Sequence, residues 1–234
     1  GGANMAIAHS RWATHGAPTD TNAHPHLDRY EQVAIIHNGI IENYLDHKEE
    51  LLARGHVFHS ETDTEVAAHV IGEEYAKGVP LEEAVRRAVK KFQGAYALVV
   101  FSKTDPGKIV ATRSASPLVV GLGKGENMLA SDIPALLPYT REVLVLDDDR
   151  VCILRPDRVE VTDLDGNELD YDVLHVDWDI DAAEKGGYEH FMLKEIMEQP
   201  TVMKQALAGR LCDDDRVHLD LGLSASDWAK SSRL

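Results

Sequence analysis

Apolar residues recur at helical spacing in several stretches of the chain. In the clearest stretch they stand three or four positions apart, as on the buried side of an amphipathic helix. Its apolar residues are Leu81, Ala84, Val85, Ala88, Val89 and Phe92. We expect further helices over residues 43–54 and 62–77, a short one over 132–137, and another within 188–207. The first of these has Leu45, Leu51 and Leu52 as apolar anchors and Gly55 as its stop, and the second has Val66, Val70 and Ile71.

Short apolar runs separated by polar turns predict strands. The runs cover residues 5–9, 33–37, 95–101, 108–113, 118–122, 127–130, 142–146, 150–154 and 159–162. Residues 95–101 are apolar throughout, which indicates a strand that is covered on both faces. We expect the strand over 33–37 to stop at Asn38, and residues 16–29, with Pro18 and Pro25, to form a loop. These elements indicate a single α/β or α+β domain.

Length and charge narrow the class of protein. A chain of 234 residues with 44% hydrophobic residues can bury a sizeable core in one domain. The formal net charge of −16 argues against a nucleic acid or an anionic membrane surface as partner, since either would need a cationic face. No apolar run approaches the length needed to span a bilayer, so we expect no membrane partner and a cytoplasmic location. Two cysteines are too few for a disulfide framework, which fits a reducing compartment.

Three short runs combine charged or amide side chains with glycine or threonine where strands are expected to end. They are residues 11–16 (Arg-Trp-Ala-Thr-His-Gly), 37–43 (His-Asn-Gly-Ile-Ile-Glu-Asn) and 60–65 (Ser-Glu-Thr-Asp-Thr-Glu). The guanidinium of Arg11 can hold a carboxylate in two parallel hydrogen bonds, and the carboxylate of Asp63 can hold an ammonium group. Together these two residues predict a site for a small zwitterion, such as an amino acid.

Asn38 and Gly39 add two hydrogen-bond donors to this site. The Asn38 side chain carries an NH₂ group, and Gly39 offers a backbone N–H with no Cβ to obstruct a ligand. Two donors that converge on one point can stabilise a developing oxyanion. Both features also have a purely structural interpretation. Asn38-Gly39 is typical of a hairpin turn, and Asp63 lies within Thr62-Asp63-Thr64-Glu65, a T-x-x-E pattern that caps a helix whose first turn favours acidic residues.

The three runs resemble the type 2 glutamine amidotransferase half of the glutamine–fructose-6-phosphate aminotransferase family. The resemblance continues through residues 113–121 (Arg-Ser-Ala-Ser-Pro-Leu-Val-Val-Gly), 130–132 (Ala-Ser-Asp) and 194–200 (Lys-Glu-Ile-Met-Glu-Gln-Pro), so it covers nearly the whole chain. Amidophosphoribosyltransferase and asparagine synthetase, which share the fold, resemble the chain less. The resemblance implies an α+β architecture, the N-terminal-nucleophile hydrolase fold, with a four-layer α-β-β-α sandwich.

The resemblance also implies an activity and roles for individual residues. In this family a cysteine thiolate attacks the amide of L-glutamine, and the ammonia passes to a second domain that converts fructose 6-phosphate to glucosamine 6-phosphate. The oxyanion hole would consist of Asn38 and Gly39, and the residues that bind L-glutamine or shape its pocket would be Arg11, Trp12, Thr14, His15, His24 and Asp63. No cofactor and no metal are implied, and the full-length enzyme is expected to be a homodimer.

One departure from the family concerns the nucleophile. The family's nucleophilic cysteine is N-terminal and lies several tens of residues before the run that begins at Arg11, whereas no cysteine precedes Arg11 here. The two cysteines, Cys152 and Cys212, match no family position. We therefore expect an N-terminally truncated amidotransferase domain over residues 1–210, followed by an acidic polar tail over 211–234 that begins a linker. The isolated chain would be inactive without the cysteine.

Two other functions compete with this interpretation. One is a glutamine-binding module that carries out no catalysis. The other is a metal-dependent hydrolase, because five histidines, His9, His15, His24, His26 and His37, lie close together in the sequence and His24-Pro25-His26 could project two imidazoles from one extended segment. Against a metal site, no H-E-x-x-H pair is present.

Overall fold

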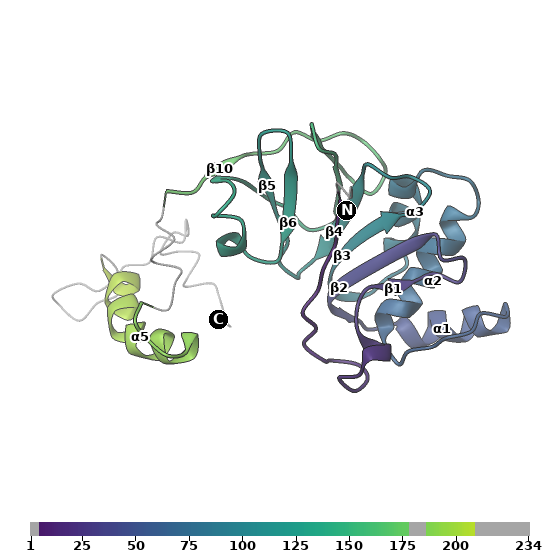
Figure 1. The fold of residues 1–234 in the computed structure, drawn as a ribbon, viewed down its shortest axis with the longest axis horizontal. Coiled ribbons are helices and arrows are strands. Elements are labelled where there is room, and N and C mark those ends of the chain that lie inside the picture. Colours follow the sequence, from purple (N-terminus) through teal and green to yellow (C-terminus); the bar gives the residue numbers. More distant parts are fainter. Residues whose placement is uncertain (1–4, 178–185, 209–234) are drawn as a thin grey trace, which may run out of the picture. The chain divides into compact units, whose positions relative to one another are not determined.

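The computed structural model describes residues 5–177 and 186–208 (Figure 1). The chain divides into two compact units between residues 178 and 179, and each is described by itself. The boundary that the sequence predicts between residues 210 and 211 lies outside the described residues. Within the described residues, every helix is too short or too polar to cross a membrane.

Over residues 5–177, the first unit contains three α-helices, two 3-10 helices and ten strands. The helices are η1 (Asp20–Asn22), α1 (Tyr44–Ala53), α2 (Asp63–Tyr75), α3 (Leu81–Val89) and η2 (Ile133–Ala135). The strands are β1 (His26–Leu27), β2 (Val33–Ile41), β3 (Gly94–Ser102), β4 (Ile109–Ser114), β5 (Val119–Leu122), β6 (Asn127–Ala130), β7 (Glu142–Val145), β8 (Arg150–Leu154), β9 (Val159–Thr162) and β10 (Leu174–His175). The second unit contains α5 (Phe191–Leu207), within the stretch where a helix was expected.

The strands form two antiparallel sheets. Six strands lie in the order β1-β2-β3-β4-β8-β9, and four lie in the order β10-β7-β5-β6. One core lies between the six-stranded sheet and the helices, where Ile35 and Leu98 of the sheet pack with Ile71. A second core lies between the sheets, where Val99 and Val120 are buried. The first unit is therefore layered helix, sheet, sheet (Figure 1), which is an α+β arrangement.

Several elements confirm the pattern seen in the sequence. The five apolar residues within α3 are all buried against the core, as their helical spacing predicted. Strand β3 contributes to both cores, which confirms a strand covered on both faces. The T-x-x-E pattern does begin α2, since Thr62 Oγ1 accepts a hydrogen bond from the Glu65 N–H. The Glu65 carboxylate does not complete the capping box, because it accepts hydrogen bonds from the N–H groups of His59 and Ser60 instead.

Helix α1 ends as expected but contributes less to the core. Gly55 has φ +81°, and hydrogen bonds from the N–H groups of Gly55 and His56 to Leu52 O and Leu51 O form a Schellman motif. Leu51 is buried, but Leu45 and Leu52 are 57% and 50% exposed. The expectation that all three leucines anchor this helix was wrong, because only one side of α1 faces the rest of the unit.

Two strand predictions near the N-terminus need correction. Residues 5–9 are not a strand, because no described strand pairs with them, although Ile7 packs against the core between the sheets. Strand β2 does not stop at Asn38. It continues to Ile41, and its ladder with β3 includes the pairs Asn38 with Ala97 and Gly39 with Tyr96. The hairpin-turn interpretation of Asn38-Gly39 was therefore wrong, because the dipeptide lies within the ladder between β2 and β3.

The loop expected over residues 16–29 is largely confirmed. It contains only the single turn η1 and the two-residue strand β1, which pairs with Ile35 and Ala34 of β2. Because β1 runs antiparallel to β2 and begins at His26, opposite Ile35, the edge of β2 beyond Ile35 has no neighbouring strand among the described residues. That open edge lies beside the start of α2, and the candidate site is built there.

Candidate functional site

One cavity of about 200 Å³ brings together residues from all three polar runs. It is lined by the eight residues predicted from the sequence, namely Arg11, Trp12, Thr14, His15, His24, Asn38, Gly39 and Asp63. Five residues that were not predicted as site residues complete the lining, namely His9, Ser10, His37, Thr62 and Thr64. The sequence signal for His37 is its position next to Asn38 at the end of a predicted strand. The signal for Thr62 and Thr64 is that they flank Asp63. His9 was singled out from the sequence only as one of the five histidines of the metal-dependent hydrolase alternative.

The open edge of β2 supplies backbone donors to this cavity. The N–H of His37 donates to Nδ1 of His24 at 3.3 Å, and the N–H of Ile41 donates to Oδ2 of Asp63 at 2.9 Å. Alternate N–H groups of a strand point to the same edge. The N–H of Gly39, midway between these two residues, therefore points to the cavity edge and away from β3.

Gly39 is the residue type that this position requires. Its φ is +113°, a conformation that residues with a side chain rarely adopt. A Cβ built here would lie 2.0 Å from the carbonyl oxygen of Ala95 and 2.8 Å from Oγ of Ser116. The absence of a side chain thus allows β2 and β3 to approach while the Gly39 N–H remains accessible.

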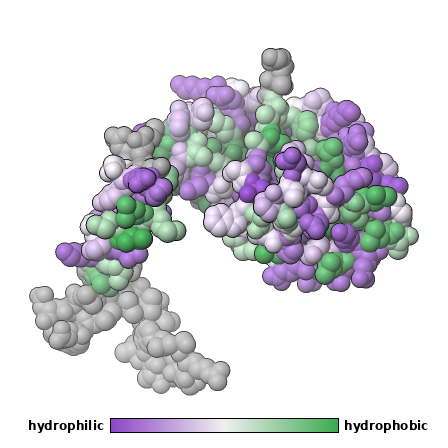
Figure 2. Space-filling model, turned by 60° about the horizontal axis from the view of Figure 1, so that its bottom comes forward, coloured by the Kyte–Doolittle hydropathy of each residue, from purple (hydrophilic) through white to green (hydrophobic). Residues whose placement is uncertain are grey.

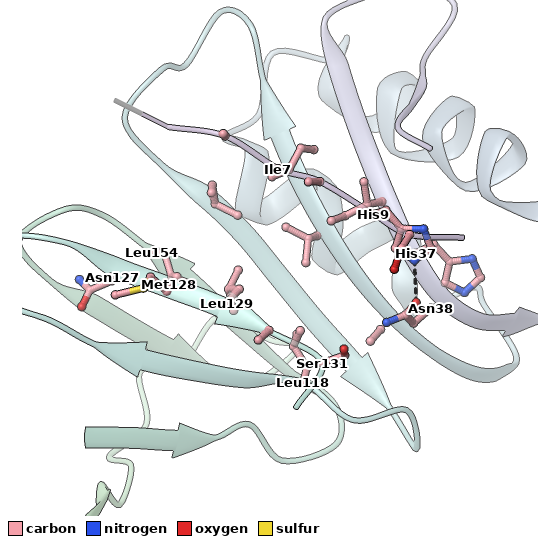
Figure 3. A pocket seen from close by; sticks show the side chains of 18 residues that line it. Ile7, His9, His37, Asn38, Leu118, Asn127, Met128, Leu129, Ser131 and Leu154 are labelled. Carbon is pink, nitrogen blue, oxygen red and sulfur yellow. Dashed lines mark hydrogen bonds between the residues drawn. The ribbon is translucent and has the colours of Figure 1, made fainter. Parts of the chain in front are cut away.

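Asn38 presents one end of its amide to the site. Its Oδ1 lies 2.6 Å from Nε2 of His9, and because a carbonyl oxygen only accepts, the imidazole donates (Figure 3). The Asn38 NH₂ group has no partner among the described residues, so it is available as a donor. Asn38 and Gly39 together offer two N–H donors at the same place on β2.

Asp63 supplies the negative charge of the cavity. Its side chain is buried, with the residue 3% exposed, at the first position of α2. Oδ2 accepts the Ile41 N–H and lies 3.8 Å from Nδ1 of His37. Oδ1 accepts no hydrogen bond from the described residues, so it can accept one from a ligand. The first-turn position also stabilises the carboxylate, because the helix dipole is positive there.

Arg11 is engaged with its own loop. Its guanidinium donates to the carbonyl oxygens of His15, Gly16 and Ala17, the last two at 3.0 and 2.9 Å. Three of the five N–H groups of an arginine are thereby used, and two remain for a ligand. Arg11 therefore organises the loop as well as placing a positive charge at the cavity.

A second contact holds the same loop against α2. Asn22, which is buried, donates from Nδ2 to Ala17 O and to Oε2 of Glu61, both at 3.0 Å. Its Oδ1 accepts the Glu61 N–H at 3.0 Å. A Cβ on Gly16 would lie 2.6 Å from Nδ2 of Asn22. Asn22 thus joins the loop that follows the first polar run to Glu61 of the third, a role that sequence reasoning missed because it depends on a contact between residues 39 positions apart.

Trp12, Thr14 and His15 lie at the rim of the cavity. Trp12 is 90% exposed. Thr14 is also exposed. His15 packs edge-on against the ring of Tyr44, with ring centroids 5.0 Å apart. The rim therefore offers an indole that no described residue covers.

Two histidines of the cavity, His24 and His37, are neutral at pH 7. Burial, followed by the charges of His9 and His26, lowers the pKa of His24 to about 3. Burial also lowers the pKa of His37 to about 4, although Asp63 opposes that shift. Asp63 and Arg11 add opposite charges to the lining of the same cavity.

The nitrogens of His24 and His26 point to different protein groups. Nδ1 of His24 accepts the His37 N–H, and Nε2 of His26 lies 3.0 Å from Oγ1 of Thr62. In the part of the chain that the structure describes, no three His, Cys, Asp or Glu side chains are grouped so as to hold a metal ion. The arrangement gives no support to the metal-dependent hydrolase.

No cysteine lines the cavity within the described residues. Cys152 lies in β8, buried between the two sheets, and burial raises the pKa of its thiol to about 12. A thiol with that pKa is almost entirely protonated at pH 7 and is therefore a poor nucleophile. Cys212 lies outside the described residues.

A larger, more apolar cavity of about 450 Å³ adjoins the site between the two sheets (Figure 3). It shares His9, Ser10, His37 and Asn38 with the first cavity. Its other walls are mainly apolar and include Ile7, Leu118, Met128, Leu129 and Leu154. Asn38 thus stands where a polar pocket meets an apolar one.

Comparison with known proteins agrees with this geometry. The profile of a family described as a glutamine amidotransferase domain matches residues 9–138, more than half of the chain. The glutamine–fructose-6-phosphate aminotransferase (isomerizing) of Thermus thermophilus is 56% identical over 220 residues, which are 94% of this chain and 36% of that protein. The enzyme of the same name from Thermotoga maritima is 54% identical over 210 residues, 90% of this chain and 34% of that protein. The chain thus spans about a third of the length of these relatives.

A solved structure shows the same fold. The glutamine phosphoribosylpyrophosphate amidotransferase of B. subtilis matches with a TM-score of 0.56 and 21% identity, over 68% of this chain and 35% of that one. This likeness confirms the N-terminal-nucleophile amidotransferase fold that the sequence motifs implied. From the family profile, from the relatives and from the assembly of all three polar runs at one cavity, we conclude that the chain belongs to the glutamine amidotransferase domain family.

Proposed function

We propose that this chain forms the glutamine site of a glutamine–fructose-6-phosphate aminotransferase, and that L-glutamine binds in the cavity of about 200 Å³. The observation that carries the proposal is the buried Asp63, whose Oδ1 is free of described donors in a cavity that Arg11 also lines. Carboxylate and guanidinium match the ammonium and carboxylate of an amino acid. The names of the relatives support glutamine as that amino acid.

The proposed orientation follows from the available donors and acceptors. The α-ammonium group of glutamine donates to Oδ1 of Asp63, and the α-carboxylate accepts from a free N–H group of Arg11. The side chain then extends along β2, where its carbonyl oxygen accepts from the Asn38 NH₂ group and the Gly39 N–H. In hydrolysis these donors stabilise the oxyanion of the tetrahedral intermediate.

Hydrolysis also needs a nucleophile. In this family the nucleophile is a cysteine thiolate, and none of the described residues that line the cavity is a cysteine. We therefore assign to this chain the binding of glutamine and the stabilisation of the oxyanion, and to a cysteine outside the described cavity the attack on the amide. We further propose that the protein to which the chain belongs transfers ammonia to fructose 6-phosphate, as the relatives' names describe. Its homodimeric assembly and cytoplasmic location are part of the same proposal.

Titration calorimetry of the 234-residue chain with L-glutamine tests the binding site. We expect one molecule of L-glutamine per chain and at least tenfold weaker binding of D-glutamine, because inversion at Cα misplaces the ammonium group. We also expect no release of glutamate by this chain. A chain that is folded by circular dichroism but binds no L-glutamine at 10 mM would contradict the proposal.

A further inference from the structure

The contact between His9 and Asn38 decides which end of an amide faces the site. The amide plane of an asparagine can turn by 180° about χ2 with little intrinsic preference. Oδ1 of Asn38 is held at 2.6 Å from Nε2 of His9, so the NH₂ group is the end left for the cavity (Figure 3). If the amide turned over, Oδ1 would face the carbonyl oxygen of glutamine, and two acceptors would repel.

Neighbouring groups hold the imidazole of His9 in place. Its ring stacks on that of His24, with centroids 4.4 Å apart and an angle of 24° between the planes. His24 is itself held, because its Nδ1 accepts the backbone N–H of His37 at 3.3 Å. The direction of the His9 Nε2–H bond is therefore set by a backbone group of β2, the strand that carries Asn38.

The same hydrogen bond selects between the two neutral tautomers of His9. A neutral imidazole that donates from Nε2 carries no proton on Nδ1. Nδ1 of His9 is buried and has no hydrogen-bond partner among the described residues. In the Nε2–H tautomer Nδ1 carries no proton, so the ring has no buried N–H that lacks an acceptor. This tautomer therefore suits the surroundings of both ring nitrogens.

We propose that His9 is a positioning residue, which orients the Asn38 amide so that its NH₂ group donates to the side-chain carbonyl oxygen of bound glutamine. This inference rests on the proposed function. His9 acts through Asn38 and does not bind the α-ammonium or α-carboxylate group. Its removal should therefore affect recognition of the glutamine side chain more than recognition of the amino-acid end.

Two ligands separate these effects. L-Glutamine and L-2-amino-5-methylhexanoate have side chains of the same shape, but only glutamine carries the carbonyl oxygen and the NH₂ group. We expect the wild-type chain to bind L-glutamine about tenfold more tightly than the isostere. This ratio reports the hydrogen bonds to the side-chain amide, which contribute about this much when a buried donor would otherwise be unpaired.

Two variants then test His9. His9→Phe keeps a ring that can stack on His24 but has no N–H, and we expect its ratio to fall to threefold or less with the affinity for the isostere unchanged. His9→Gln keeps an N–H donor at a similar reach, and we expect its ratio to stay near the wild-type value. A His9→Phe chain with the wild-type ratio overturns the inference, as does an equal loss of affinity for both ligands.

The proposed function and this inference fail in different ways. A folded wild-type chain that binds neither ligand refutes both. A wild-type chain that prefers glutamine, with a His9→Phe chain that prefers it equally, refutes only the role of His9. If His9→Phe does not fold, ¹⁵N NMR of the wild-type imidazole decides the question. We expect the Nε2–H tautomer, and the Nδ1–H tautomer would overturn the inference because it cannot donate to Asn38.

Discussion

The carboxylate of Asp63 accepts a hydrogen bond from the backbone N–H of Ile41 at 2.9 Å, which joins the first turn of α2 to the last residue of β2. The same side chain has an oxygen free for the ammonium group of a ligand. Asp63 thus holds the two elements that form the cavity and also supplies its negative charge, and substitutions can separate these two roles.

Asp63→Asn keeps an acceptor for the Ile41 N–H but removes the charge. We expect at least a tenfold loss of L-glutamine affinity, with a change of less than about 1 kcal/mol in the free energy of unfolding, since the helix dipole contributes about that much. Asp63→Ala leaves the Ile41 N–H unpaired and should cost about 1–3 kcal/mol of stability as well. Calorimetry and urea unfolding measure both quantities, and glutamine binding by Asp63→Asn at wild-type affinity would refute the assigned role.

Gly39→Ala should destabilise the fold strongly. The added Cβ would lie 2.0 Å from the Ala95 carbonyl oxygen at a residue with φ +113°, so β2 and β3 must separate. We expect a loss of about 3 kcal/mol or more in the free energy of unfolding. Gly78→Ala is the matched control, because Gly78 also has a positive φ, +81°, but a Cβ there meets no atom within 4 Å. It should cost only about 1 kcal/mol, and equal losses for the two variants would show that the contact with Ala95 is unimportant.

A buried histidine pair away from the cavity should make stability depend on pH. Nδ1 of His56 and Nδ1 of His69 are 2.7 Å apart, and Nε2 of His56 donates to Glu73 at 2.9 Å. His69 is 3% exposed, and burial followed by the charge of His56 lowers its pKa to about 4. Glu65 opposes this shift. Both imidazoles are therefore neutral in the folded protein at pH 7.

Unfolded histidine has a pKa of about 6.5, so between pH 6.5 and pH 4 the unfolded chain binds a proton at His69 that the folded chain does not. The stabilising effect is complete above pH 6.5 and is lost as the pH falls toward 4, by about 3 kcal/mol. Urea unfolding at pH 7.0, 5.5 and 4.5 measures this loss. His69→Phe should lose stability less steeply, and His59→Phe, at an exposed histidine, should follow the wild type. Identical pH dependence in all three chains would count against the pair.

Trp12 should report ligand binding without contributing to stability. Its side chain is 90% exposed at the rim of the cavity, so Trp12→Phe should change the free energy of unfolding by less than about 0.5 kcal/mol. If the indole closes over glutamine, its fluorescence emission should shift to shorter wavelength on addition of L-glutamine. The chain has two further tryptophans, so the Trp12→Phe chain, in which the shift should disappear, is the required control. A shift that persists in this variant would assign the signal to another residue.

The second unit differs from the first in how its apolar residues are placed. Figure 2 shows hydrophobic side chains on the visible side of α5. In this helix Ile196 and Met197 are 51% and 57% exposed. The sequence predicted a helix within residues 188–207, and α5 lies there, since a helix satisfies its backbone hydrogen bonds locally. Spacing alone does not determine what its apolar side contacts.

The sequence by itself determined the elements whose signals are local. The apolar spacing in residues 81–89 predicted α3, the apolar run over 95–101 predicted β3, and the Thr62 pattern predicted the start of α2. The resemblance carried by the three polar runs and by the later motifs implied the fold, and it named eight of the residues that line one cavity. These successes share a cause, since periodicity, capping and motif composition all act over a few neighbouring residues.

Only the tertiary structure decided what depends on contacts between distant residues. Pairing with β3 carries β2 through Asn38-Gly39, where the dipeptide alone suggested a turn. The packing of α1 leaves Leu45 exposed. Residues 5–9 do not form a strand, because no described strand pairs with them. Likewise, the hydrogen bond that orients the Asn38 amide comes from His9, 29 residues earlier. The reason is physical. When a backbone group or an amide has two possible hydrogen-bond partners, the fold determines which partner lies close enough to bind, and local sequence cannot specify that partner.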